Sequence, residues 1–345
     1  MPGFPQPILR PPNNVVRHRI GRSRFPGGGL GVFATVDIKQ GDLVFSERPF
    51  FISLRHIPCA FNELWPELAA SKGIRQRETD LKMMLNRMPE EDRKTYLSLH
   101  SFQEDKEMGP LTGIFHTNSF SLDQLVGSEH VGESYSGVFR DGSRINTSCS
   151  PSLGCWFNLP TFAMEFRAVR NIKQGEELTI KYFQNVLEYR EERHVALANY
   201  GFTCECHSCK RWPYSDLARA SILLNQDPKR WRLVLWLMKQ ELKGVSQGWV
   251  VEQSVRTVQA IEQEGLEVAP PYYDHLAFLV DAYCAMGNVK EAVTWLRKFE
   301  ATKRVGYGGE EKSVRELLHT VKSHRTWDWA SRVKAVIMHT GIASA

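Results

Sequence analysis

The spacing of the cysteines near residue 206 constrains this chain more than any other feature. Residues 203–209 read Thr-Cys-Glu-Cys-His-Ser-Cys, and loops this short aim three sulfurs at one point. Because a closed structural zinc site takes four nitrogen or sulfur ligands, the segment is one ligand short. Cys149 or Cys155 is the candidate for the fourth ligand, and His207 is a weaker one because it lies inside the short loop. The sequence therefore predicts a zinc site that joins two distant segments.

The composition is that of an ordinary globular protein. The chain has 345 residues, of which 42% are hydrophobic and 24% charged; this length is typical of two domains, or of one large domain with an appendage. A net charge of +5 is too mild to indicate nucleic-acid binding, and no run approaches the roughly 18 apolar residues of a membrane span. The total of 7 cysteines is odd, which favours a reducing compartment over a disulfide framework. We therefore expect an intracellular protein that binds neither membranes nor nucleic acid directly.

Two strand-like segments follow a proline-rich lead over residues 1–18. Residues 27–35 (Gly-Gly-Gly-Leu-Gly-Val-Phe-Ala-Thr) and 38–45 together predict a strand, then a turn at Gln40-Gly41, then a second strand. Glycines allow a ligand to approach the backbone closely. The segment is not a dinucleotide-binding fingerprint, because no helix signal follows the glycines.

Residues 62–108 change character and predict helices. Leu81, Met84, Leu85 and Met88 recur at the spacing of one helix face. Pro89, followed by two glutamates, is typical of the start of another helix.

Two further segments alternate in the manner of half-buried strands. In residues 164–168 (Met-Glu-Phe-Arg-Ala), apolar and charged residues alternate. In residues 178–182 (Leu-Thr-Ile-Lys-Tyr), the alternation places Tyr182 on the same face as Leu178 and Ile180. With the helices predicted elsewhere, these strands indicate an α+β fold.

The remainder of the chain after Trp212-Pro213 predicts helices. One apolar face is formed by Trp231, Val234, Leu235 and Met238, and another by Val314, Leu317, Leu318 and Val321. Between them, residues 276–296 predict a helix pair broken at Gly287-Asn288, similar to one tetratricopeptide-type hairpin. A single hairpin is not a repeat array, because stacking takes about three repeats.

Three motifs, in this order, resemble the SET-domain lysine methyltransferases. They are Arg-Ile-Asn-Thr-Ser-Cys at 144–149, Gly-Glu-Glu-Leu-Thr-Ile-Lys-Tyr at 175–182, and the cysteine segment at 203–209. The SET- and MYND-type branch is most similar, but a MYND zinc finger is not expected because Cys59 is the only cysteine before Cys149. The resemblance implies a SET β-sheet core over 19–183 with a helical insertion at about 58–112, then a post-SET zinc segment over 184–212. An α-helical C-terminal domain over 213–345 follows, with its hairpin at about 272–300.

The resemblance also implies the functional residues. It implies that Tyr182 is catalytic, that Tyr200 and Phe183 line the channel for the substrate lysine, and that Cys149 is the fourth zinc ligand. The implied cofactor-binding residues are Gly29, Leu30, Gly31, Asn118, Asn146, Thr147 and Phe202, and the implied zinc ligands are Cys149, Cys204, Cys206 and Cys209. From the residues alone, an asparagine that caps a turn fits position 118 as well, and a buried core tyrosine fits position 182.

Two residues depart from the family pattern: Thr147 stands in place of a histidine, and Ser152 in place of an asparagine. Because that histidine contacts the adenine chiefly through its main chain, the resemblance implies weakened but not lost cofactor binding. We therefore predict an S-adenosylmethionine-dependent protein-lysine N-methyltransferase with a structural Zn²⁺. It is expected in the nucleus, the cytoplasm or both, acting on a histone or other protein, with a protein partner on its C-terminal domain. The alternative is a degenerate SET domain that serves as a non-catalytic interaction module.

Overall fold

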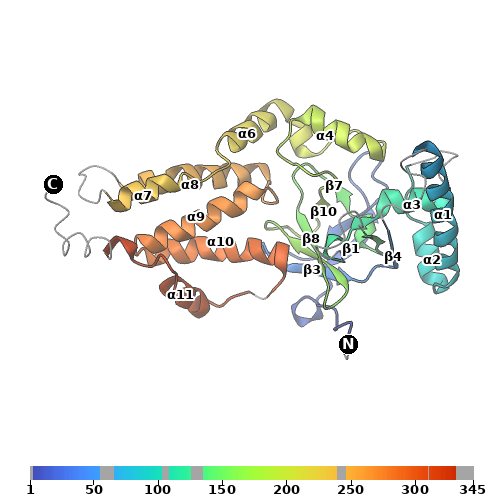
Figure 1. Ribbon diagram of the computed structural model, residues 1–345, viewed down its shortest axis with the longest axis horizontal. Coiled ribbons are helices and arrows are strands. Elements are labelled where there is room, and N and C mark those ends of the chain that lie inside the picture. The colour runs from blue at the N-terminus through green and yellow to red at the C-terminus, as the bar shows by residue number, and fades with distance from the viewer. Residues whose placement is uncertain are drawn as a thin grey trace.

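Three small β-sheets form the centre of the molecule (Figure 1). The computed structural model describes residues 3–54, 66–102, 109–125, 135–238, 246–309 and 311–331. The first sheet has the order β1 (His18–Arg22), β2 (Leu30–Ala34), β10 (Glu177–Ile180), β7 (Asn146–Thr147). The second is ordered β3 (Leu43–Glu47), β9 (Ala163–Ala168), β8 (Leu153–Asn158), and the third β4 (Phe51–Leu54), β6 (Tyr135–Val138), β5 (Phe120–Ser121). The predicted β-sheet core and the α+β class are confirmed.

The first sheet brings two of the sequence motifs side by side. Strand β10 pairs in parallel with β7, so that Thr179 lies opposite Asn146 and Ile180 opposite Thr147. On its other edge β10 pairs with β2, the strand that follows the glycine-rich turn. The segment at 175–182 is therefore the element around which the candidate site is assembled.

The prediction of a half-buried strand at 164–168 is wrong, because both faces of β9 are buried. Met164, Phe166 and Ala168 belong to the central core, as predicted. On the opposite face, Glu165 and Arg167 form an ion pair at 2.9 Å beneath helix α10 (Val289–Tyr307), which packs across β8 and β9. Because these two charges are paired, a buried face carries the alternating charged residues that are typical of a solvent-exposed face.

The predicted helical insertion is observed beside the third sheet (Figure 1). It contains α1 (Pro66–Asn86), α2 (Glu90–Leu97) and α3 (Pro110–Asn118). Leu81 and Leu85 are buried at its core, as the spacing predicts, and Pro89 precedes α2 as its N-cap. Residues 55–65, including Cys59, and residues 103–108 lie outside the described part of the chain.

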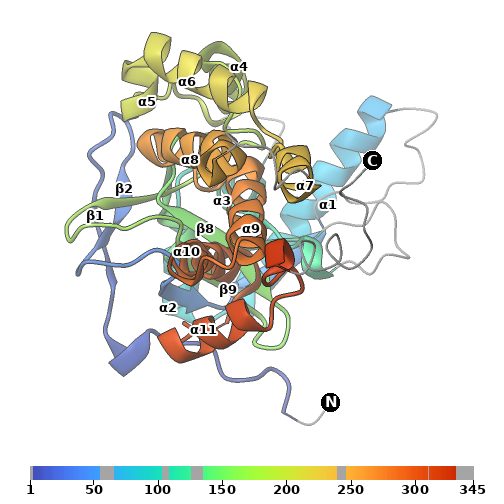
Figure 2. The ribbon, with the colours of Figure 1, turned by 90° about the vertical axis from the view of Figure 1, so that its left-hand side faces the viewer.

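Helices make up the described chain after the last strand. They are α4 (Arg190–Leu197), α5 (His207–Lys210), α6 (Trp212–Leu224), α7 (Arg230–Met238), α8 (Gln247–Glu264), α9 (Pro270–Ala285), α10 and α11 (Val314–Lys322). Figure 2 shows α8, α9 and α10 nearly end-on, stacked one below another. The predicted hairpin corresponds to α9 and α10; its break lies at Gly287, whose φ of 69° suits glycine, and at Asn288, which caps α10. Within the described residues, no helix is both long and apolar enough to cross a membrane.

The two apolar faces predicted in this region are only partly correct. In α7, Trp231, Val234 and Met238 are exposed, and Leu233 and Leu237 are buried instead. This helix reads Arg-Trp-Arg-Leu-Val-Leu-Trp-Leu-Met, so more than one face is apolar and the spacing does not select between them. In α11, Leu317 and Val321 are buried as predicted, whereas Val314 in the first turn is exposed.

Candidate functional site

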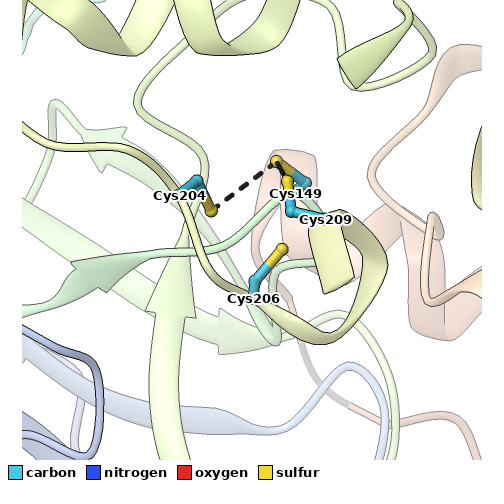
Figure 3. A group of neighbouring side chains, drawn as sticks. All are labelled: Cys149, Cys204, Cys206 and Cys209. Carbon is cyan, nitrogen blue, oxygen red and sulfur yellow. Dashed lines mark hydrogen bonds between the residues drawn. The ribbon is translucent and has the colours of Figure 1, made fainter. Parts of the chain in front are cut away.

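Four cysteine sulfurs converge on one point between the sheet and the C-terminal helices (Figure 3). Cys149 follows β7, Cys204 and Cys206 lie before α5, and Cys209 lies within it. All four side chains are buried and their sulfurs lie within 4.8 Å of one another; Cys149 Sγ is 3.5 Å from Cys209 Sγ and 3.9 Å from Cys204 Sγ. A tetrahedral zinc with Zn–S bonds of about 2.3 Å separates its sulfurs by roughly 3.8 Å. The cluster therefore fits zinc.

The structure also decides between the candidates for the fourth ligand. Cys155 is exposed on β8 and is not part of the cluster. The His207 ring lies 2.9 Å from the Arg211 guanidinium and is not part of it either. Cys149 is the residue that completes the set.

The charges around the cluster suit a thiolate-bound metal. Hydrogen bonds among the four thiols lower the pKa of Cys206 and Cys209 and raise the pKa of Cys149 and Cys204, so that two of the four carry the thiolate character before a metal is bound. Two arginines without any exposed surface, Arg193 and Arg219, lie beside the sulfurs. A zinc ion with four thiolates carries a net negative charge, which buried cations can balance.

The two arginines differ in their partners. Arg193 pairs with Asp216 at 3.2 Å, and its Nη2 is 3.9 Å from Cys209 Sγ. Arg219 Nη2 donates to the carbonyl of Cys149 at 3.2 Å, but among the described residues no carboxylate lies within ion-pair distance of it. The charge of Arg219 therefore faces both the cysteine sulfurs and the Glu264 carboxylate, which is linked to it through Ser215.

We expect Arg219→Met to loosen the metal site. The substitution removes a buried cation and leaves the carbonyls of Val186 and Cys149 without their donor, a type of loss that costs about 1–3 kcal/mol. Zinc should then pass to a competing chelator faster than from wild type, and the midpoint of urea unfolding should fall. Arg211→Met, which changes an exposed arginine of the same segment, is the matched control; equal zinc release from both variants would contradict the charge argument.

A cavity of about 870 Å³ lies next to the cysteine cluster. Its walls come from three parts of the chain: the glycine-rich turn at 25–30, the segment 98–102 of the insertion, and residues 200–205. Asn146, Thr147 and Tyr182 complete it from the central sheet. Its volume lies in the range of small-molecule sites.

A second cavity, of about 500 Å³, shares these tyrosines in its wall. It is lined by Tyr182, Phe183, Tyr200 and polar residues that include His116, Asn185 and Glu188. Tyr182, Tyr200 and Thr117 line both cavities. The two sites therefore meet at this tyrosine pair, whose ring centres are 4.8 Å apart.

The hydroxyl of Tyr182 is fixed at the boundary. It donates to the carbonyl of Ile145 at 2.6 Å, and the backbone N–H of Tyr182 donates to Thr147 Oγ1 at 3.2 Å. Burial raises the pKa of Tyr182, and the nearby Tyr200 adds to this effect. The phenol is therefore neutral at physiological pH, and its proton is donated to the carbonyl of Ile145.

The predicted cofactor residues occupy different places. Gly29, with a φ of 57°, and the half-exposed Leu30 line the larger cavity, as does Phe202. Gly31 does not line it; a Cβ there would lie 2.4 Å from Glu177 Oε1, so the glycine makes room for that carboxylate. Asn146 lines the cavity, and its side-chain amide donates to the carbonyl of Leu30 at 3.2 Å.

Asn118 and the residues that depart from the family pattern also serve the fold. Asn118 lines the larger cavity, but its Nδ2 donates to the carbonyls of His100 and Ile114, so it caps the end of α3 as well. Thr147 accepts the Tyr182 N–H, as described above. Ser152 is fully buried and bonded through both N and Oγ to Thr179 of β10. Threonine and serine therefore stabilise β10 and the segment that follows it, which carries Tyr182.

Several lining residues carried no signal in the sequence. The segment 98–102 follows a helix of the insertion, and its position over the cavity depends on long-range packing. Glu177, which does not line the cavity, is only part of a motif in the sequence, although its carboxylate accepts three hydrogen bonds across the sheet.

The segment 98–102 contacts the zinc segment at one glycine. Gly201 has a φ of 74°, and a Cβ there would lie 1.6 Å from Phe102 Cε2. We expect Gly201→Ala to displace Phe102 from the wall of the larger cavity and to lower the free energy of unfolding by about 1–3 kcal/mol. Calorimetric titration should also show weaker binding of a ligand in that cavity. Gly175→Ala is the control, because Gly175 has a similar φ of 79° and no atom within 4 Å of its Cβ position. Equal effects of the two would show that backbone strain alone is responsible.

Comparison with known proteins agrees with this architecture. Residues 29–183 match the family model of the SET domain, so this part of the chain is a SET domain, as the motifs predict. The chain is 26% identical to the histone-lysine N-methyltransferase set5 of Schizosaccharomyces pombe over 202 residues, which cover 57% of this chain and 54% of that protein. It is also 26% identical to the histone-lysine N-methyltransferase SMYD3 of Homo sapiens over 300 residues, or 84% of this chain and 63% of that protein. The chain thus spans between about half and two thirds of the length of these relatives.

A solved structure was also aligned with the chain. The SET domain of LSMT, bound to lysine and AdoHcy, aligns over 95% of this chain and 88% of its own, at 14% identity and a TM-score of 0.30.

Proposed function

We propose that this chain, through its SET domain, is a protein-lysine N-methyltransferase that uses S-adenosylmethionine. The observation that carries the proposal is the pair of cavities, about 870 Å³ and 500 Å³, that meet at Tyr182 and Tyr200. Methyl transfer from a sulfonium to an amine is an in-line displacement, so donor and acceptor approach from opposite sides. Two cavities that share Thr117, Tyr182 and Tyr200 in their walls are compatible with this geometry.

In this proposal the larger cavity holds the cofactor. The turn at 25–30 offers backbone groups at close range, Asn146 and Thr147 lie on the floor, and Phe202 supplies an aromatic surface for the adenine. The cofactor supplies the methyl group and the sulfonium charge that makes it transferable. The chain's own residues bind and orient it and exclude water.

The smaller cavity then admits the substrate lysine. Its aromatic walls, Tyr182, Phe183 and Tyr200, exclude water from the reacting amine. A lysine ammonium has a reference pKa of about 10.4 and must lose its proton before it can attack, which costs roughly 4 kcal/mol at neutral pH. Desolvation between aromatic rings lowers this pKa and so reduces that cost.

Tyr182 acts as an oriented hydroxyl and not as the base. Its raised pKa opposes ionisation, and its proton is already donated to the Ile145 carbonyl. What it presents to the ligands is the lone-pair side of its oxygen, which stabilises the partly positive methyl group and amine at the junction.

The proposed zinc has a structural role. Cys204 and Cys206 are adjacent in sequence to Thr203, Phe202 and Tyr200, which line the cavities. A metal held by Cys149 of the sheet segment and by this loop fixes both tyrosine and phenylalanine over the cofactor. The metal therefore takes no part in the transfer itself.

The substrate class follows from the relatives. Both are named as histone-lysine N-methyltransferases, so histones are the first candidates and other protein lysines the second. We place the activity inside the cell, in the nucleus, the cytoplasm or both, and assign the helical C-terminal domain to a protein partner.

The test is direct. Purified protein is incubated with methyl-labelled S-adenosylmethionine and either core histones or a whole-cell extract, and labelled lysines are identified by mass spectrometry. We expect label on lysine side chains. Calorimetric titration with the cofactor runs in parallel: absence of both binding and label would favour the non-catalytic interaction module.

A further inference from the structure

Glu177 stands apart from the proposed cofactor residues because it does not line the cavity. It lies in β10, where it is opposite Phe33 of the neighbouring strand β2, and its side chain is 8% exposed. Its carboxylate points across β2 toward the glycine-rich turn and accepts hydrogen bonds from two different segments. The proposed chemistry leaves this buried acid without a role.

The contacts of the carboxylate define that role. Oε1 accepts from Ser23 Oγ at 2.7 Å and from Asn146 Nδ2 at 2.9 Å, and Oε2 accepts from the backbone N–H of Arg24 at 2.9 Å. Ser23 and Arg24 directly precede the glycine-rich turn. Asn146 lies in β7 and lines the cavity beside that turn. One carboxylate therefore ties the start of the turn to the neighbouring asparagine.

The surrounding backbone is shaped to admit this carboxylate. A Cβ on Gly31 would lie 2.4 Å from Glu177 Oε1 and 3.1 Å from Asn146 Nδ2, so only glycine leaves space for the contact. Asn146 Nδ2 also donates to the carbonyls of Gly28 and Leu30 at 3.3 and 3.2 Å, which ties the far end of the turn to the same group. The turn is thus held at both ends.

We propose that Glu177 is a positioning residue that sets the affinity for S-adenosylmethionine by holding the glycine-rich turn and Asn146 in their binding geometry. This inference rests on the proposed function of the larger cavity. A turn that must be ordered on binding costs affinity, whereas a turn ordered beforehand does not. Loss of the clamp therefore weakens cofactor binding and leaves the transfer step intact once the cofactor is bound.

The experiment uses the full chain with S-adenosylhomocysteine, which binds without turnover, as the calorimetric probe. In Glu177→Gln an amide NH₂ replaces one acceptor and opposes either the Arg24 N–H or the Ser23 and Asn146 donors. We expect its Kd to rise about tenfold, and that of Ser23→Ala about threefold. The double variant should bind no more weakly than Glu177→Gln, because the serine acts through the carboxylate.

The control and the kinetic readout separate positioning from general stability. Glu176→Gln changes the adjacent carboxylate, which contacts Arg170 and the Lys173 N–H outside the cavity, and should leave Kd unchanged. In Glu177→Gln the KM for S-adenosylmethionine should rise with its Kd, whereas kcat at saturating cofactor stays within about threefold of wild type.

Each other outcome overturns the proposal or its premise. A Kd within twofold of wild type in Glu177→Gln, or a loss of kcat without a change in Kd, refutes the positioning role. If Glu177→Gln does not fold, Ser23→Ala carries the test alone, and an unchanged Kd in that variant refutes the proposal. If wild type itself does not bind the probe, the proposed function fails, and the role of Glu177 fails with it.

Discussion

Zinc is expected to be lost, and the cysteine segment at residues 201–210 to unfold, when Cys204 and Cys206 are both replaced by alanine. Four buried sulfurs within 4.8 Å of one another hold residues 203–209 against the sheet segment at Cys149. Structural zinc contributes on the order of 10 kcal/mol in small domains. Because the same segment carries Phe202 and follows Tyr200, the variant should also lose cofactor binding. Elemental analysis gives the zinc content, and thermal unfolding gives the stability.

A matched pair of single variants tests the fourth ligand. Cys149→Ala removes the sulfur supplied by the sheet, whereas Cys155→Ala removes an exposed cysteine only six positions further along the chain. The first should lower zinc content and stability, and the second should change neither. One zinc per chain in Cys149→Ala, at the stability of wild type, would contradict the assignment.

The cysteine site was predictable because its constraint is covalent and local. Three ligands fall within six residues, and the required number of four makes a distant partner necessary. The spacing alone did not choose between Cys149 and Cys155. In the fold, β10 pairs in parallel with β7, and Cys149 follows β7 by two residues. This pairing places Cys149 near the end of β10, the strand that precedes the zinc segment. The pairing of these strands is tertiary structure, which the spacing of cysteines along the sequence does not predict.

The burial of individual strand and helix faces was harder to predict than the positions of the strands and helices. Strands β2, β3, β9 and β10 and the hairpin of α9 and α10 lie where the patterns place them. The outer face of β9 is predicted to be exposed but is buried, because Glu165 and Arg167 neutralise each other under α10. The segment 98–102 and Glu177 acquire their roles only when the insertion and the glycine-rich turn close on the central strand.

The Tyr182→Phe variant should bind the cofactor within a few-fold of wild type, yet transfer methyl groups slower by a factor of about a hundred or more, as for loss of one oriented polar group. Phenylalanine keeps the ring that packs 4.8 Å from Tyr200 and removes only the hydroxyl bonded to Ile145. Single-turnover rates with a lysine peptide give the transfer step, and calorimetry gives the affinity.

Tyr200→Phe is the comparison that locates the chemistry, because Tyr200 lines both cavities and packs against Tyr182. If the hydroxyl of Tyr182 meets the reacting atoms, Tyr182→Phe must lose far more rate than Tyr200→Phe at the same cofactor affinity. Since the raised pKa keeps Tyr182 protonated, the wild-type rate should rise with pH as the substrate amine deprotonates, and Tyr182→Phe should show the same slope at a lower level. Unchanged turnover in Tyr182→Phe would show that Tyr182 is a core residue without a role in the transfer. A changed slope would mean that it takes the proton after all.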